Sequence, residues 1–138
     1  MRTAVGMMLI VAGMASCREE AAPDALYRIE APPVTLPQGG EGVASVRFVA
    51  QSGYHWNEEF PAKVEIQEAP GLEVPKKRFA SADIASKQGT GVLAIPLKAA
   101  SQGAPRRVVR ATADFSVCNQ DECRIFKGVR LEVPVDVH

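Results

Sequence analysis

The chain has 138 residues, of which 46% are hydrophobic and 23% charged, and its 16 Lys and Arg balance its 16 Asp and Glu. A chain of this length builds one hydrophobic core, so we expect a single domain. The basic residues are dispersed, and their longest cluster, residues 76–78, is too short to form a phosphate-binding patch. We therefore expect no nucleic-acid partner.

Residues 1–16 have the pattern of a signal peptide. A short basic start precedes an uncharged run from Ala4 to Ala15, which is too short to cross a hydrocarbon core of about 30 Å. Ala15 and Ser16 stand immediately before Cys17 and resemble a bacterial lipobox, where a lipoprotein is cleaved and its new amino-terminal cysteine is acylated. An ordinary secretory signal with a nearby cysteine is the alternative. Either signal predicts export.

Export and lipidation predict where the mature chain works. We expect residues 17–24 to form a polar tether after a lipid anchor at Cys17, with the domain spanning residues 25–138 on the periplasmic side of a bacterial membrane. Arg18 stands in place of the Asp that retains some lipoproteins at the inner membrane, which favours the outer membrane by analogy. The other two cysteines, Cys118 and Cys123, would then meet an oxidising compartment.

From Leu26 onward, hydrophobic residues recur with a period of two, which predicts β-strands separated by glycine-containing turns. Pro96 and Pro134 have no N–H to donate, so we expect their segments at sheet edges or bulges. With no long helical pattern after the signal, the expected fold class is all-β, an antiparallel two-sheet sandwich. The residues expected on the core faces are Ala44, Val46, Phe48, Ala50, Val64, Ile66, Leu93, Ile95, Leu97, Val109, Ala111, Ala113, Phe115, Val117, Leu131, Val133, Val135 and Val137.

Cys118 and Cys123 flank four polar residues between the last two predicted strands. Facing residues of an antiparallel pair lie about 4.5–5.5 Å apart, a separation that a disulfide spans. The spacing therefore predicts a disulfide across the mouth of a hairpin. Because Cys118 continues the polar face of Asp114 and Ser116, we expect it outside the core, where a partner thiolate could approach its sulfur.

The pair by itself leaves two functions open. A disulfide that closes six residues stabilises a fold by about 2 kcal/mol, against nearly 5 kcal/mol for a loop of about a hundred residues. A structural disulfide would therefore stabilise the fold more if it closed a longer loop. Against dithiol exchange, Asp121 and Glu122 disfavour a thiolate unless Arg124 or His55 offsets their charge. Both dithiol exchange and a structural disulfide remain possible readings of the residues.

Metal chemistry is not expected. Cys118, Cys123 and His55 fall short of the four ligands that a structural zinc site uses. All four methionines lie within residues 1–16, which leaves the mature chain without the thioether ligands of a copper carrier. We therefore predict no metal and no cofactor.

Two segments resemble the periplasmic amino-terminal domain of DsbD, the thiol:disulfide interchange protein. They are Gly-Tyr-His-Trp-Asn at residues 53–57 and Phe-Ser-Val-Cys, four residues and Cys at residues 115–123, and the resemblance runs from about Leu26 to Val137. It implies an immunoglobulin-like sandwich. It also implies that Cys118 and Cys123 are a redox-active pair and that Cys123 forms the mixed disulfide with a partner.

The resemblance further implies near-site residues. Tyr54 and Trp56, with His55 between them, match aromatic positions that pack near the cysteine pair. Phe79, with the neighbouring residues Arg78 and Asp83, corresponds loosely to a cap loop that shields the pair between partners.

The implied partners are thioredoxin-like redox proteins and periplasmic disulfide proteins, which would make the chain a protein-disulfide reductase. No counterpart of the transmembrane and carboxyl-terminal thioredoxin-like domains of DsbD occurs before His138, so we expect electrons to come from another protein. The alternative is a non-enzymatic envelope module that binds a partner protein and holds a structural disulfide.

Overall fold

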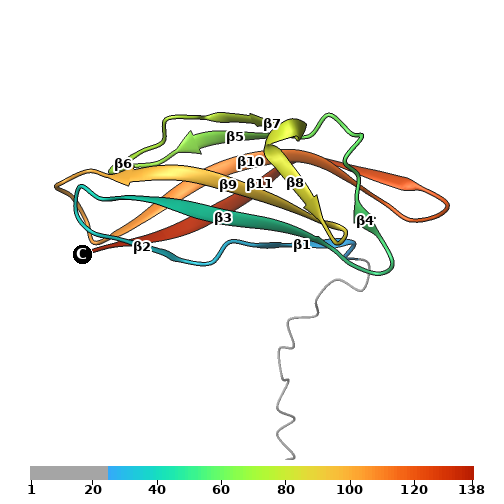
Figure 1. Ribbon diagram of the computed structural model, residues 1–138, viewed down its shortest axis with the longest axis horizontal. Helices are drawn as coiled ribbons and strands as arrows, with labels where there is room; N and C mark the ends of the chain where they lie inside the picture. Colours follow the sequence, from blue (N-terminus) through green and yellow to red (C-terminus); the bar gives the residue numbers. More distant parts are fainter. Residues whose placement is uncertain (1–24) are drawn as a thin grey trace, which may run out of the picture.

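The computed structural model describes residues 25–138, which form two β-sheets packed against each other (Figure 1). The expected signal peptide, lipidation site and tether fall on residues 1–24 and lie outside the described residues. Within residues 25–138 the only helix is a single 3-10 turn, η1 (Ser81–Asp83), and no helix is long and apolar enough to cross a membrane. The strands are β1 (Tyr27–Glu30), β2 (Val34–Leu36), β3 (Glu41–Ala50), β4 (His55–Trp56), β5 (Lys63–Glu68), β6 (Leu72–Glu73), β7 (Arg78–Ala80), β8 (Ile84–Lys87), β9 (Thr90–Ala99), β10 (Arg106–Cys118) and β11 (Cys123–Val137).

The strand order defines the fold. One sheet has the order β1-β3-β9-β6, with β8 also pairing with β9, and the other has the order β2-β11-β10-β5-β7, with β4 also pairing with β10. Every pair is antiparallel except β2 with β11. In chain order, β1, β3, β8 and β9 take the A, B, D and E positions of an immunoglobulin domain, and β5, β10 and β11 take C, F and G. The expected immunoglobulin-like β-sandwich is confirmed.

The core forms where the period-two pattern placed it, because successive side chains of a strand point to opposite sheet faces. The predicted core residues of β9, β10 and β11 are all buried, whereas Ala50 and Ile66 are only partly buried. Pro96 pairs with β3 and Pro134 with β10, and neither has a registered partner on its other side. Both prolines therefore occupy local edges, although β9 as a whole is an interior strand.

A bulge interrupts β11 where it passes the middle of β10. Ala113 pairs with Val129 but Phe115 pairs with Phe126, so two steps along β10 match three along β11. Gly128 lies within the bulge at φ +63°, in the left-handed region that favours glycine. The bulge reverses the alternation of β11, so Phe126 packs against the core although the later core residues of this strand are odd-numbered.

Phe115 lies at the centre of an aromatic cluster that joins the two sheets. Its ring centroid is 4.9 Å from that of Tyr27, 5.1 Å from Phe48, 5.7 Å from Trp56 and 5.5 Å from Phe126, and its side chain is fully buried. Phe48 and Phe115 come from the B and F strands, which a disulfide links in antibody domains. Here aromatic packing supplies that link between the sheets.

Replacing Phe115 by alanine should lower the free energy of unfolding by about 3–5 kcal/mol, because the substitution removes the ring that all four neighbours contact. The matched control is Thr112→Ala on the opposite face of β10, where the expected loss is less than about 1 kcal/mol. Urea denaturation followed by tryptophan fluorescence measures both values. Similar small losses in the two variants would show that the cluster does not hold the sheets together.

Candidate functional site

The two cysteines end the hairpin formed by β10 and β11. Cys118 is the last residue of β10 and Cys123 the first of β11; they face each other in register, with their Cα atoms 4.0 Å apart, and form a disulfide. This hairpin projects beyond the sandwich at the end opposite the chain's carboxyl terminus (Figure 1). The predicted disulfide across a hairpin mouth is confirmed.

The turn between the cysteines has hydrogen bonds of its own. The Asn119 N–H donates to the carbonyl oxygen of Glu122 over 2.9 Å. The Asn119 side-chain oxygen accepts from the backbone N–H groups of Asp121 and Glu122, at 2.9 and 2.8 Å. An asparagine that accepts bonds from the following backbone is a common turn-forming device. The turn is therefore specified without the sulfur atoms.

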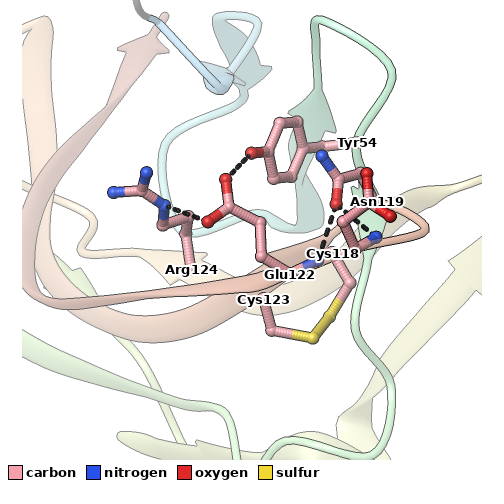
Figure 2. A network of polar contacts seen from close by, with 7 residues as sticks. Tyr54, Cys118, Asn119, Glu122, Cys123 and Arg124 are labelled. Carbon is pink, nitrogen blue, oxygen red and sulfur yellow. Dashed lines mark hydrogen bonds and ion pairs between the residues drawn. A yellow bond between two sulfur atoms is a disulfide. The ribbon is translucent and has the colours of Figure 1, made fainter.

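A polar network holds the Glu122 carboxylate on the side of the hairpin away from the disulfide (Figure 2). The Tyr54 hydroxyl donates to one carboxylate oxygen, and Arg124 Nε lies 3.3 Å from the other. The hydrogen bond from Tyr54, with the nearby charge of Arg124, lowers the pKa of Glu122, and the same hydrogen bond raises the pKa of Tyr54. Arg124, rather than His55, therefore offsets the Glu122 charge.

The two sulfur-bearing residues differ in exposure. Cys118 faces away from the sandwich core, as predicted, because the preceding Val117 takes the core side. Cys118 is only 7% exposed, whereas Cys123 is exposed, so the two residues are not equally open to a partner. The cause is β4, which runs along β10 and sets His55 opposite Cys118.

Ser116, two residues before Cys118, is covered in the same way. The Asn57 N–H donates to the Ser116 carbonyl over 3.0 Å, and the Asn57 side-chain amide donates to the Ser116 hydroxyl over 3.4 Å. Ser116 is fully buried as a result. The outer face of this end of β10 is thus covered by the segment that follows β4.

An open depression of about 300 Å³ surrounds the disulfide. Trp56 lines the depression on the side of the core, because it is only 3% exposed and its ring packs on the aromatic cluster. Gly91 makes this position possible, because a Cβ there would lie 2.6 Å from Trp56 Cδ2. The residues that line the depression are His55, Trp56, Asn57, Glu58, Glu59, Cys118 and Cys123. His55 and Trp56 therefore lie beside the disulfide, whereas Tyr54 does not line the depression and instead contacts Glu122 in the turn.

The residues matched to a cap loop lie elsewhere. Phe79 is 4% exposed, pairs opposite Val64 and belongs to the core. Asp83 accepts a hydrogen bond from Lys76 Nζ over 2.7 Å and another from the Ala80 N–H over 2.8 Å, and these bonds lower its pKa. Neither Phe79 nor Asp83 lines the depression. Asp83 instead fixes the turn at η1.

Among residues 25–138, no three His, Cys, Asp or Glu side chains gather closely enough to hold a metal ion.

One exposed residue beside the disulfide, Ile125, was not predicted from the sequence. Ile125 on β11 is 56% exposed and pairs with Ser116 of β10. The available signal was the neighbouring pair Ile125 and Phe126, because adjacent strand residues cannot both face one core. The bulge at Gly128 decides that Phe126 is the inward member.

The described chain is thus an immunoglobulin-like β-sandwich that carries a disulfide at the mouth of its F–G hairpin. No protein-family model matches the sequence, and no curated protein is significantly similar to it.

Solved structures with a similar arrangement share little sequence with it. WR4, an MSP family member from C. elegans, is 8% identical with a TM-score of 0.40, over 81% of this chain and 95% of its own. The structure of the Coh-OlpC-Doc435 cohesin–dockerin complex from Clostridium thermocellum gives 10% identity and a TM-score of 0.42, over 88% of this chain and 100% of that one. AggA, a fimbrial subunit from Escherichia coli, gives 10% and 0.38, over 81% and 94%. Likeness at this level carries no information on function.

Replacing Tyr54 by phenylalanine should raise the pKa of Glu122 toward its ordinary value, because the hydrogen bond from the hydroxyl is the largest cause of the lowered pKa. The group has a lower pKa in the folded than in the unfolded chain. Its contribution to stability is therefore present at neutral pH and lost as the pH falls through the folded-state pKa. Carbon-detected NMR titration of the Glu122 carboxyl measures the change, and an unchanged titration would contradict the network.

Proposed function

We propose that this protein is an exported thiol:disulfide interchange module that resembles the amino-terminal domain of DsbD. It would pass electrons between a thioredoxin-like donor and disulfide proteins of the envelope through Cys118 and Cys123. The observation that carries the proposal is the unequal exposure of the bonded cysteines, with Cys123 exposed at the end of a projecting hairpin and Cys118 only 7% exposed.

Unequal exposure assigns different steps to the two sulfur atoms. The donor thiolate attacks Cys123 Sγ, a bond forms between these sulfurs, the Cys118–Cys123 bond breaks, and Cys118 leaves as a thiolate that takes up a proton. The donor's second thiol then loses its proton and attacks the donor sulfur of this mixed disulfide, which releases Cys123. Two electrons and one proton pass to the module, and Cys123 is left as a thiolate.

The reverse sequence delivers those electrons. The Cys123 thiolate attacks an acceptor disulfide and releases one acceptor thiolate, which takes up a proton. Cys118 then loses its proton, attacks Cys123 Sγ and expels the second acceptor thiolate. Cys118 needs to meet only its neighbour, so its cover by β4 is compatible with this role.

The surroundings of the hairpin suit a bond that opens and closes. Neither the Asn119 hydrogen bonds of the turn nor the contacts of Tyr54 and Arg124 with Glu122 involve a sulfur atom. Pairing with Arg124 also lessens the repulsion that Glu122 would exert on a thiolate. The reduced form would therefore resemble the oxidised form.

A second candidate function is a binding module with a structural disulfide. The burial of Cys118 favours it, since buried disulfides exchange slowly with outside thiols. Under this reading the hairpin would bind an envelope partner without exchange.

The reduction potential of the Cys118–Cys123 disulfide separates the two candidates. Exchange with a thioredoxin-like donor predicts a potential above about −270 mV, whereas structural disulfides of secreted proteins lie below roughly −300 mV. Equilibration with glutathione or dithiothreitol buffers, followed by alkylation and mass spectrometry, gives the value. Circular dichroism should show that the reduced chain stays folded, since a six-residue loop contributes only about 2 kcal/mol. A potential below −300 mV, or unfolding on reduction, would refute the exchange function and support the binding module.

We also propose that the mature chain is a lipoprotein on the periplasmic side of a bacterial membrane, anchored through Cys17. If so, the protein expressed in bacteria should partition into the detergent phase of a Triton extraction, and Cys17→Ala should block its processing or move it to the aqueous phase. Cys123→Ala is the control, because it removes a cysteine without touching the signal. Processing and detergent partitioning that are both unchanged in Cys17→Ala would overturn the anchor.

A further inference from the structure

One exposed apolar side chain lies beside the disulfide. Among residues 25–138, the two large hydrophobic residues that are exposed are Val43, at 59%, and Ile125, at 56%. Val43 lies on β3 in the other sheet. Ile125 lies two residues after Cys123 on the same face of β11, at a spacing of about 7 Å for a rise of 3.4 Å per residue. An approaching partner thiol would meet Ile125 and Cys123 together.

The edge of the sheet is open at the same place. β11 pairs with β2 only through Val135–Val137. Within the described part of the chain, Cys123 and Ile125 have a strand partner on the β10 side alone. A partner can therefore approach both residues from the outer face and from the edge.

The other side of the disulfide is acidic. Glu58 and Glu59 are exposed and line the depression beside Cys118 and Cys123. Of the ion pairs formed by residues 25–138, none includes Glu58 or Glu59. These two carboxylates are free to attract a basic group, in contrast to Glu122, which is paired with Arg124.

We infer that Ile125, Glu58 and Glu59 form a selectivity surface around Cys123, which fits a partner protein with apolar and basic residues next to its reactive cysteine. The inference rests on the proposed exchange function. Burial of Ile125 against an apolar neighbour favours the encounter complex, and the two carboxylates steer a basic partner toward it. Neither contribution needs any change in the chemistry of the sulfur atoms.

The test measures how fast Cys123 reacts with activated peptide disulfides. In the full chain carrying Cys118→Ser, the Cys123 thiolate attacks the peptide sulfur of a pyridyl disulfide; the new sulfur–sulfur bond forms and coloured thiopyridone leaves. Three capped pentapeptides have a central cysteine flanked by leucines and terminal lysines, by serines and terminal lysines, or by leucines and terminal glutamates. The pyridyl disulfide of mercaptoethanol reports the intrinsic reactivity of Cys123.

The apolar contribution is read from Ile125→Ser. We expect this substitution to slow the reaction of both leucine peptides about fivefold and to change the serine peptide and mercaptoethanol probes less than about twofold. Val43→Ser removes an equally exposed apolar side chain from the other sheet and should change none of the rates. Equal effects of Ile125→Ser on the leucine and serine peptides, or an equal effect of Val43→Ser, would overturn the apolar part.

The acidic contribution is read from the double substitution Glu58→Gln and Glu59→Gln. At low salt we expect the lysine peptides to slow about threefold and the glutamate peptide to react faster, and both changes should vanish at about 1 M salt, where screening is strong. The matched control is Glu41→Gln with Glu73→Gln, two exposed carboxylates on the other sheet. Rates that ignore peptide charge would overturn the acidic part.

The two proposals fail in different ways. A disulfide potential below −300 mV contradicts the exchange function whatever the peptides do. Normal reaction with the mercaptoethanol probe and a potential above −270 mV, combined with no discrimination among the peptides, would keep the exchange function and refute the selectivity surface.

Discussion

The packing of Phe115 between the two sheets is the contact on which the other features depend. It joins β10 to β3 through Phe48 and to β4 through Trp56. Because Trp56 is fixed in the core, the preceding His55 is set opposite Cys118, and β4 covers that cysteine. A single buried ring thus links the stability of the sandwich to the unequal exposure of the two sulfurs. Antibody domains use a disulfide between the same strands, whereas this chain keeps its disulfide for the hairpin mouth.

The side chains of β10 alternate between the core of the sandwich and the face that carries the disulfide. Its inward residues, such as Phe115 and Val117, build the core, and the outward Cys118 carries the disulfide. Opening the sulfur–sulfur bond therefore removes no core contact. The turn, Tyr54 and Arg124 hold the hairpin tip by separate polar contacts. The proposed exchange therefore requires no change in the core of the sandwich.

The disulfide end also has two chemically different sides. Glu58 and Glu59 lie beside the depression, and Ile125 lies on the open strand edge. The carboxylate closest in sequence to the sulfurs, Glu122, is turned to the opposite side of the hairpin and paired there (Figure 2). Under the proposed exchange function, Glu58 and Glu59 would attract a basic partner, while pairing with Arg124 lessens the effect of Glu122 on a thiolate.

The order of residues was enough to predict the sandwich, the core faces of its long strands and the hairpin disulfide, because strand alternation and the separation of paired residues are local geometry. It also marked Tyr54, His55 and Trp56 as neighbours of the cysteines. The order of residues did not predict that Cys118 is covered, that Phe79 lies in the core or that Ile125 is exposed beside Cys123. The exposure of Cys118 is set by β4, which is distant in the chain but pairs beside β10 in the sheet, and the exposure of Ile125 is set by the bulge that shifts β11.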